Sequence, residues 1–312
     1  MKYLVIGIGG VGGSIAGFLS LGGKDVACIA RGEHLKALQT NGLHLKSDLK
    51  GEHHLHLPTY ATETYNEKAD VIFVCVKAYS LKPIIPFIER VSHSKTIVIP
   101  ILNGFAIGSH LQQMLPTVTI LEGCIYIVSE RISLGEINQQ GNIFRLVYGV
   151  PPGSHCPIEP LEAIKEDLTN CGIKVDLSDH IRRDTFIKWA FISAAAVTGA
   201  YYDVPMRELQ NQGHQRDTFI RLSEEIQALA VQMNIILPED QVSYNLKVLD
   251  KMLPESRSSM QRDLMCGGNS ELQAILFDVL RFAEDYQIDL PTYRLMANHF
   301  QNVVQTSNHN QQ

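Results

Sequence analysis

The glycine pattern at the start of the chain constrains its fold more than any other feature. An apolar run over residues 3–6 leads into Gly7-Ile8-Gly9-Gly10-Val11-Gly12, and a second apolar run follows over residues 14–21. A strand, a Gly-x-Gly-x-x-Gly turn and a helix form the phosphate-binding unit of dinucleotide-binding domains. The first glycine permits a tight turn, the second leaves room for the pyrophosphate, and the third lets the helix pack on the strand. The free N–H groups at the start of the helix attract phosphate. We therefore predict that residues 7–12 bind a dinucleotide.

The end of the second predicted strand indicates which dinucleotide is bound. Residues 25–30 form this strand, and Arg31 follows it. Folds specific for NAD usually carry an acidic residue here to hold the ribose hydroxyls, whereas an arginine suits the 2′-phosphate of NADP. Glu33 lies two residues further on and would weaken this preference. We predict NADP over NAD, with a merely solvated Arg31 as the alternative.

Length and composition are those of a globular protein with two cores. The chain has 312 residues, of which 45% are hydrophobic and 19% are charged, and its net charge is −6. Without a lysine- or arginine-rich run it lacks the basic surface that nucleic acid requires, so nucleic acid is not an expected partner. The most apolar long run, residues 186–200, is too short to span a bilayer and contains a lysine. No membrane association is expected.

The six cysteines indicate a cytoplasmic protein. They form no Cys-x-x-Cys pair, and two of them lie inside apolar runs typical of strands. This usage is typical of reduced, buried thiols in an intracellular protein. Because the first residues are predicted to form a strand, we expect no signal peptide.

The first half of the chain alternates strands with helices. Residues 69–76 and 96–102 are continuous apolar runs, the pattern of parallel strands covered on both faces. Lys77 follows the first run, and Asn103 follows the second. Ligands of open α/β sheets bind beyond the carboxyl ends of the strands. We therefore expect Lys77 near the cofactor phosphates or ribose, with a solvated lysine as an equal alternative, and Asn103 near the nicotinamide.

Further strands and helices complete this half. Gln139-Gln140-Gly141 is a hairpin signal between the strands predicted at 131–137 and 142–148, which would add an antiparallel edge to the parallel sheet. Residues 1–178 are predicted to form a Rossmann-type α/β domain. Its other predicted elements are strands at 43–46, 118–129 and 173–177 and helices at 33–41, 105–115 and 157–171.

Residues 51–58 alternate polar and apolar side chains, which places His54 and His56 on one face of a strand. Two such histidines could bind a metal, but no carboxylate or cysteine is spaced to complete a site. A solvent-facing strand is favoured, and we predict no metal.

Beyond residue 178 the strand signals stop. We predict helices over residues 180–200, 206–210, 216–233, 238–252, 270–287 and 291–305. Residues 179–312 are predicted to form an all-helical domain, and the cleft between the two domains is the expected substrate site. The apolar helices could bury the interface of a homodimer or only their own core, and the sequence leaves both open.

Lys188 is the strongest catalytic candidate in the helical half. It lies in Thr185-Phe186-Ile187-Lys188-Trp189-Ala190-Phe191-Ile192, among large apolar side chains. A lysine in such a run either extends its ammonium to the surface or is held in a cleft, and spacing alone favours the surface. In a cleft, partial desolvation would lower the pKa of the ammonium and suit it to proton donation near neutral pH.

Two polar positions precede helices in the last third of the chain. Ser258 and Ser259 are suited to capping one helix, and Glu271 falls in the first turn of another, which Asn269 or Ser270 would cap. An acidic residue there complements the helix dipole, which is a sufficient structural reason for it.

These residues together resemble the ketopantoate reductase (2-dehydropantoate 2-reductase) family over nearly the whole chain. Each element alone is a weak signal, and their collinear set is a strong one. The matching elements are the turn at residues 7–12, Arg31, Val76-Lys77-Ala78, Asn103-Gly104, Lys188, Ser258-Ser259-Met260 and Glu271.

The resemblance implies NADPH-dependent reduction of a 2-keto acid, with ketopantoate and pantothenate biosynthesis as the family's substrate and pathway. Lys188 would be the catalytic proton donor and would polarise the carbonyl oxygen. Asn103 would hold cofactor and substrate oxygens, and Ser259 the polar end of the substrate. Lys77, Ser129 and Glu271 would contact NADPH.

Three positions depart from the family pattern on the substrate side. The family carries asparagines one and two helical turns after the lysine, where this chain has Ile192 and Ala196, and another where it has Met206. A pocket without these hydrogen-bond partners would bind a polar substrate poorly. Two alternatives therefore stand beside ketopantoate reduction: a reductase of a more apolar keto substrate, and an NADPH-binding sensor without catalysis.

Overall fold

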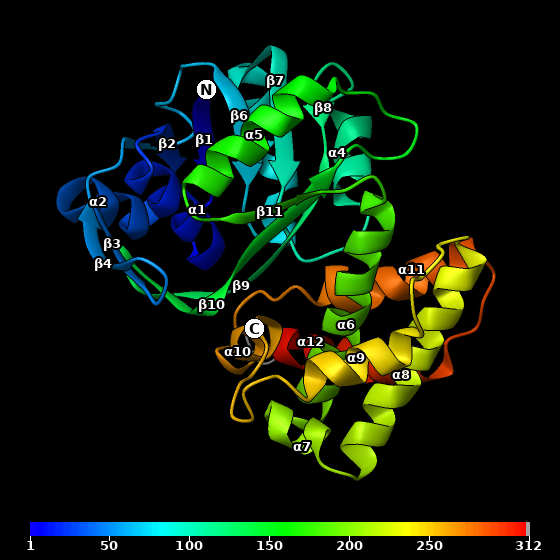
Figure 1. Cartoon of the computed structure of the whole chain (residues 1–312). Coiled ribbons are helices and arrows are strands. Elements are labelled where there is room, and N and C mark those ends of the chain that lie inside the picture. The colour runs from blue at the N-terminus through cyan, green and yellow to red at the C-terminus, as the bar shows by residue number, and fades with distance from the viewer. Residues whose placement is uncertain (310–312) are drawn as a thin grey trace. The chain divides into compact units, whose positions relative to one another are not determined.

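A computed structural model describes residues 1–309 of the chain, and side chains as far as residue 301. The chain divides into two compact units. The first unit comprises Met1–Leu102 and Ala106–Asp184, and the second comprises Asn103–Phe105 and Thr185–Gln312. Each unit is described by itself below (Figure 1).

The first unit is built around a parallel sheet of six strands. The strand order is β5-β2-β1-β6-β7-β8, and every neighbouring pair is parallel. The strands are β1 (Lys2–Ile6), β2 (Asp25–Ile29), β5 (Thr59–Tyr60), β6 (Ala69–Val74), β7 (Ser92–Pro100) and β8 (Thr119–Ile120).

Both faces of this sheet are buried, as the continuous apolar runs predict. In β1, Tyr3 and Val5 belong to one hydrophobic cluster, and Leu4 and Ile6 belong to another. Side chains of α1 (Gly10–Leu21) and α5 (Ile158–Asn170) join the first cluster, whereas α3 (Ile85–Val91) and α4 (Ile107–Met114) join the second. Helices thus cover both faces, which is the doubly wound arrangement of a Rossmann-type fold.

The register of the sheet brings four chain segments to one edge. Ile6 pairs with Ile29 on one side and with Val74 on the other, and Val74 pairs with Pro100. Because all four strands are parallel, the residues that follow them leave the sheet at the same carboxyl edge. That edge is where open α/β sheets bind their ligands.

A second sheet lies in the same unit, and it corrects one expectation. The antiparallel hairpin does not extend the parallel sheet; it belongs to a separate five-stranded sheet with order β11-β10-β3-β4, in which β9 pairs with β10. Apolar side chains of this sheet, such as Leu45 and Phe144, pack into the cluster that also contains α1. The strands are β3 (Leu43–Ser47), β4 (Gly51–Leu55), β9 (Glu122–Ser133), β10 (Glu136–Gly149) and β11 (Lys174–Leu177).

The hairpin turn was also predicted at the wrong place. β9 and β10 are joined at Leu134-Gly135, whereas Gln139-Gln140-Gly141 lies inside β10 at a register shift between Gln140 and Phe144. The buried Gln139 amide donates to the carbonyl oxygens of Gln140 and Gly141 at 2.9 Å each, which stabilises this bulge. A glycine-containing polar triplet serves a bulge as well as a turn, so local sequence cannot distinguish the two.

Within the described residues, the second unit contains helices and no strands, as predicted. α6 (Ile181–Tyr202) begins in the first unit and continues into the second. The helix predicted from residue 238 begins at Gln241, because the Asp240 carboxylate caps it by accepting from the Ser243 N–H at 2.7 Å. The others are α7 (Met206–Gln210), α8 (His214–Gln232), α9 (Gln241–Leu249), α10 (Ser259–Met265), α11 (Asp278–Asp285) and α12 (Pro291–His309).

The single helix predicted over residues 270–287 is wrong in one respect. Its first part, Gln273–Phe277, is a π-helical turn, and α11 follows it. Such turns widen the backbone ladder locally and occur often at functional sites. No helix among residues 1–309 has both the length and the apolar character needed to cross a membrane.

Candidate functional site

The turn after β1 has the space that a dinucleotide pyrophosphate needs. Gly7 has a φ of +94°, and a Cβ on Gly12 would lie only 2.1 Å from the Gly7 carbonyl oxygen, so the turn and the helix pack at closest approach. A Cβ on Gly9, by contrast, would meet nothing within 4 Å. Two glycines are thus required by the fold, and Gly9 faces open space where a ligand can approach the backbone.

The start of α1 is electrostatically suited to bind phosphate. The helix begins at Gly10 with Gly9 as its N-cap, four residues earlier than predicted. Gly9 offers no side chain to accept from the N–H groups of the first turn, and that turn contains no acidic residue. Donors and the positive end of the helix dipole therefore remain for an anion. Ile8 is 3% exposed and Val11 packs against the core, so these two would contribute through their backbones.

Ser129 holds this turn from the neighbouring strand β9. Its hydroxyl donates to the Gly10 carbonyl oxygen at 2.9 Å, and the Ser14 hydroxyl lies 2.9 Å from it. The backbone is equally close, because a Cβ on Gly10 would lie 2.4 Å from the Ser129 carbonyl oxygen. Ser129 therefore lies at the predicted site and positions the first turn of α1.

His34 supports the glycine turn as well, and the sequence did not reveal it. The residue is buried on α2 (Gly32–Asn41). Its Nε2–H donates to the Ile8 carbonyl oxygen at 2.6 Å, and its Nδ1 accepts from the Gly135 N–H at 3.1 Å. Nδ1 can accept only while the ring is neutral, and burial lowers the pKa of His34. Its partners are 26 and 101 residues away, so no local pattern could identify the role.

Arg31 and Lys77 leave the carboxyl edge on opposite sides of the turn. Arg31 is exposed and is the N-cap of α2, two residues after β2 ends. Glu33, which could have neutralised it, instead accepts from Lys36 Nζ at 2.7 Å. Lys77 is half-buried and follows the end of β6 by three residues. The parallel sheet thus places both cations where the sequence predicts them.

Three predicted residues from distant parts of the chain meet in the second unit. Lys188 Nζ lies 3.4 Å from Asn103 Oδ1, and Asn103 Nδ2 donates to Glu271 Oε2 at 3.3 Å. Glu271 is 3% exposed and Lys188 is half-buried. Asn103 uses both ends of its amide and so links an ammonium to a buried carboxylate. Lys188 therefore does not simply extend to solvent, which was the alternative for this position.

Aromatic packing fixes this polar group. The Phe105 ring stacks on the Trp189 ring with centroids 5.4 Å apart and meets the Phe186 ring edge-on at 5.2 Å. The Trp189 indole N–H donates to the Ala274 carbonyl oxygen at 2.9 Å, and Ser193 Oγ donates to the Ile275 carbonyl oxygen at 2.6 Å. Side chains of α6 thus satisfy carbonyls of the π-helical turn, close in sequence to Glu271.

Comparison with known proteins agrees with these observations. Residues 3–153 match the family model described as ketopantoate reductase PanE/ApbA, and residues 180–304 match the model of its C-terminal domain. The chain belongs to the ketopantoate reductase family. It is thereby an oxidoreductase.

Two curated relatives and one solved structure show how far the likeness extends. The chain is 29% identical to the uncharacterized oxidoreductase YkpB of Bacillus subtilis, covering 87% of this chain and 88% of that protein. It is 26% identical to a 2-dehydropantoate 2-reductase of Mesorhizobium japonicum, covering 94% of each. The fold matches that of D-mandelate dehydrogenase, solved with NADH and anilino(oxo)acetate, with a TM-score of 0.85, 19% identity and 96% coverage of each chain.

The positions at which this ketopantoate reductase family member departs from the pattern are mostly apolar and covered. Ile192 and Ala196 follow Lys188 by one and two turns of α6, so they share its face. Ile192 is half-buried, and Ala196 and Met206 are 1% and 2% exposed. The side chains of Ile192 and Ala196 cannot accept or donate a hydrogen bond, and the Met206 sulfur is only a weak acceptor.

Ser259 is the first residue of α10 and is half-buried. The cap of that helix is Ser258, whose Oγ accepts from the Gln261 N–H at 3.1 Å, so the capping prediction holds for Ser258. Gln261 in turn donates to the Val204 carbonyl oxygen at 2.8 Å and would clash with a Cβ on Gly199 of α6. Ser259 is therefore carried on a helix docked against α6, and its role in substrate binding stays a prediction.

One expectation about histidines is wrong. His54 does have a carboxylate partner, because Glu52 lies two residues before it on β4 and His44 lies on the paired strand β3. His56 does not belong to this group; it follows the end of β4. Glu52 lies within the same strand as His54, whereas His44 comes from the paired strand, which a search along one strand misses.

Two glycine variants separate folding from ligand binding. Gly9→Ala should unfold like the wild type, within about 0.5 kcal/mol. It should nevertheless bind a nicotinamide dinucleotide at least about tenfold more weakly, because its methyl group occupies the pyrophosphate space. Gly12→Ala should lose about 1–3 kcal/mol of stability from overpacking. Urea unfolding and fluorescence titration measure both, and unchanged binding by Gly9→Ala would contradict the assignment.

The stability contributed by His34 should depend on pH. Its folded pKa lies below the ordinary value of 6.5, so below pH 6.5 the unfolded chain binds the proton more readily than the folded one. The contribution is complete above that pH and is lost as the pH falls. The difference in unfolding free energy between wild type and His34→Gln should therefore shrink between pH 7.5 and pH 5.5. A constant difference in urea unfolding would rule out a buried neutral ring.

Proposed function

We propose that this protein is an NADPH-dependent reductase of a 2-keto acid, with conversion of ketopantoate to pantoate as the first candidate reaction. The observation that carries the proposal is the Lys188–Asn103–Glu271 group, assembled from three distant chain segments. A chain that only bound a dinucleotide would need the glycine turn, but it would not need a lysine that contacts Asn103 as Lys188 does.

The residues of the carboxyl edge suit a nicotinamide dinucleotide. The open space above Gly9 and the donors of α1 would hold the pyrophosphate. Arg31 would pair with a 2′-phosphate, which favours NADPH, and Lys77 would contact phosphate or ribose. NADH bound to D-mandelate dehydrogenase supports the dinucleotide class without deciding between the two forms. When bound, the dinucleotide would supply the hydride for the substrate carbonyl carbon.

Lys188 would supply the proton. In the reduction of a 2-keto acid, negative charge develops on the carbonyl oxygen as its carbon is reduced. An ammonium that donates to this oxygen stabilises the charge and transfers the proton, which yields the 2-hydroxy acid. Neutral Lys188 then regains a proton from solvent.

Asn103 and Glu271 would orient the lysine and the ligands. Asn103 follows the end of β7 after two intervening residues, so the chain itself ties it to the carboxyl edge. Glu271 accepts from its amide nitrogen and thereby fixes which end of the amide faces Lys188. We assign the same two residues to contacts with the cofactor, and Ser259 to the polar end of the substrate.

A second candidate substrate is a more apolar keto acid. Ile192, Ala196 and Met206 replace polar positions of the family and offer no strong hydrogen bond to a hydroxyl group. YkpB, which is 29% identical to this chain, is named an uncharacterized oxidoreductase. The Mesorhizobium japonicum protein, which is 26% identical, is named a 2-dehydropantoate 2-reductase. D-mandelate dehydrogenase shares this fold and is solved with anilino(oxo)acetate, an aromatic 2-oxo acid derivative, which supports a substrate with an apolar group.

Two further properties belong to the proposal. No disulfide joins any of the six cysteines, which supports a cytoplasmic location. A homodimer is consistent with the apolar character of the helical half.

Steady-state NADPH oxidation tests the function, with ketopantoate and a panel of apolar 2-keto acids. Lys188→Met should lower kcat about 10²–10³-fold on the accepted substrate, the usual cost of removing one such donor. Its affinity for NADPH should stay within about threefold of the wild type, because Lys188 acts on the substrate. The exposed Lys251→Met is the control. Efficient ketopantoate turnover would exclude the altered substrate, and NADPH binding without turnover of any keto acid would favour a sensor.

Cofactor choice is tested at Arg31. Arg31→Ala should raise the Kd for NADPH about tenfold, because a charge-assisted contact with the 2′-phosphate is lost. The Kd for NADH should be unchanged. Lys36→Ala, which removes a nearby cation paired with Glu33, should affect neither. Equal effects on both dinucleotides would contradict the predicted role of Arg31.

A further inference from the structure

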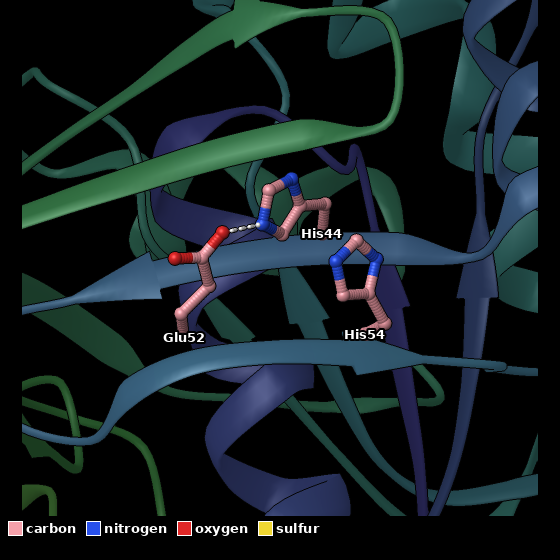
Figure 2. Close-up of side chains that lie close together, drawn as sticks. All are labelled: His44, Glu52 and His54. Carbon is pink, nitrogen blue, oxygen red and sulfur yellow. Dashed lines mark hydrogen bonds and ion pairs between the residues drawn. The ribbon is translucent and has the colours of Figure 1, made fainter.

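The pairing of β3 with β4 brings two histidines and a carboxylate together on one face of the second sheet. His44 pairs directly with His54 across the two antiparallel strands. Glu52 lies two residues before His54, and residues two apart on a strand project to the same face. Figure 2 shows the three side chains projecting together from the two strands.

Their ligand atoms are close enough to share one ion. One ligand atom from each of the three residues lies within 4.8 Å of the others. His44 Nε2 is 2.6 Å from Glu52 Oε1, and the His44 and His54 rings stack with centroids 4.0 Å apart. Around a tetrahedral zinc ion with bonds of about 2.0–2.2 Å, ligand atoms are about 3.4 Å apart. The exposed side chains of Glu52 and His54 can close this gap by rotating.

A third strand orients the central histidine. His44 Nδ1 lies 2.9 Å from Glu136 Oε1 on β10, and Ser133 Oγ donates to Glu136 Oε2 at 2.6 Å. A carboxylate behind a histidine fixes the proton on the rear nitrogen and directs the front nitrogen at a metal. Both nitrogens of His44 face carboxylates, Nδ1 facing Glu136 and Nε2 facing Glu52, so a cation between Nε2 and Glu52 would have two ligands and a carboxylate behind one of them. The arrangement with a cation is that of a carboxylate–histidine–metal site.

We propose that His44, Glu52 and His54 bind a divalent transition-metal ion of the zinc class, with Glu136 as the positioning carboxylate. Two imidazole nitrogens and one carboxylate oxygen suit Zn²⁺, whereas Mg²⁺ and Ca²⁺ prefer oxygen ligands. Water would complete the four ligands. Lys46 Nζ, 3.9 Å from Glu52 Oε1, competes for that carboxylate and should moderate the affinity.

The ion would serve the structure of the sheet. β4 is the last strand in the order of the second sheet, and it pairs only with β3. An ion held by residues of both strands would link them through side chains in addition to the backbone ladder. None of its ligands belongs to the glycine turn or to the Lys188 group. The reductase activity proposed above is therefore independent of this site.

Isothermal titration with ZnCl₂ tests the proposal, in untagged full-length protein with the exposed Cys266 replaced by serine. We expect one Zn²⁺ per chain and a higher Tm in its presence. His54→Ala and Glu52→Ala should each weaken binding at least tenfold, and Glu136→Gln should weaken it about 10–100-fold, the usual effect of removing such a carboxylate. All of these side chains are at least partly exposed, so the variants should fold.

The matched control is His56→Ala, which removes an exposed histidine just beyond β4 and should leave binding unchanged. MgCl₂ and CaCl₂ at the same concentrations should give no binding. Equal weakening by His56→Ala and His54→Ala, or no Zn²⁺ binding at 100 times the protein concentration, would overturn the proposal. Unchanged affinity in Glu136→Gln would remove the positioning role and leave the three ligands.

Discussion

The turn after β1 and the helix that follows it approach each other closely in the first unit. A Cβ on Gly12 would come within 2.1 Å of the Gly7 carbonyl oxygen, so α1 packs on its strand only because no side chain stands between them. That packing places the start of α1 over the carboxyl edge, beside Arg31 and Lys77. Ser129 on β9 and His34 on α2 then donate hydrogen bonds to carbonyl oxygens at this turn. The phosphate site that we propose for the first unit depends on this approach.

The second unit depends on a different kind of contact, a polar group whose residues are followed or flanked in sequence by packed aromatic rings. Asn103 reaches Lys188 through its oxygen and Glu271 through its nitrogen, so a single amide orients both charged groups. The rings of Phe105 and Trp189 stack on each other, and this contact holds together the segments that carry Asn103 and Lys188. In the proposed function, dinucleotide binding by the glycine turn thus belongs to the first unit and proton donation by Lys188 to the second. Ile192 and Ala196, which share a face of α6 with Lys188, are both apolar.

Prediction from the sequence succeeded where the signal was local. The strands β1, β6 and β7, the glycine turn and the N-cap Ser258 all follow from periodicity and short motifs. Prediction failed where the position of a residue depends on which strands pair. The hairpin joins a separate sheet, its turn lies at Leu134-Gly135, and His44 meets His54 across strands. These contacts depend on register, and a shift of one residue in register would move every side chain to the opposite face.

By itself, the sequence determined the two-part organisation, the dinucleotide turn and the residues that lie at strand ends. Each of these follows from the order of neighbouring residues, because strand, turn and helix propensities act over a few positions. Only the tertiary structure decided that Lys188 lies against Asn103, that Glu271 is buried behind it, and that His34 supports the turn from 26 residues away. Hydrogen bonds between distant segments form because the core of each unit brings its own segments together. A local sequence pattern contains no information about such contacts.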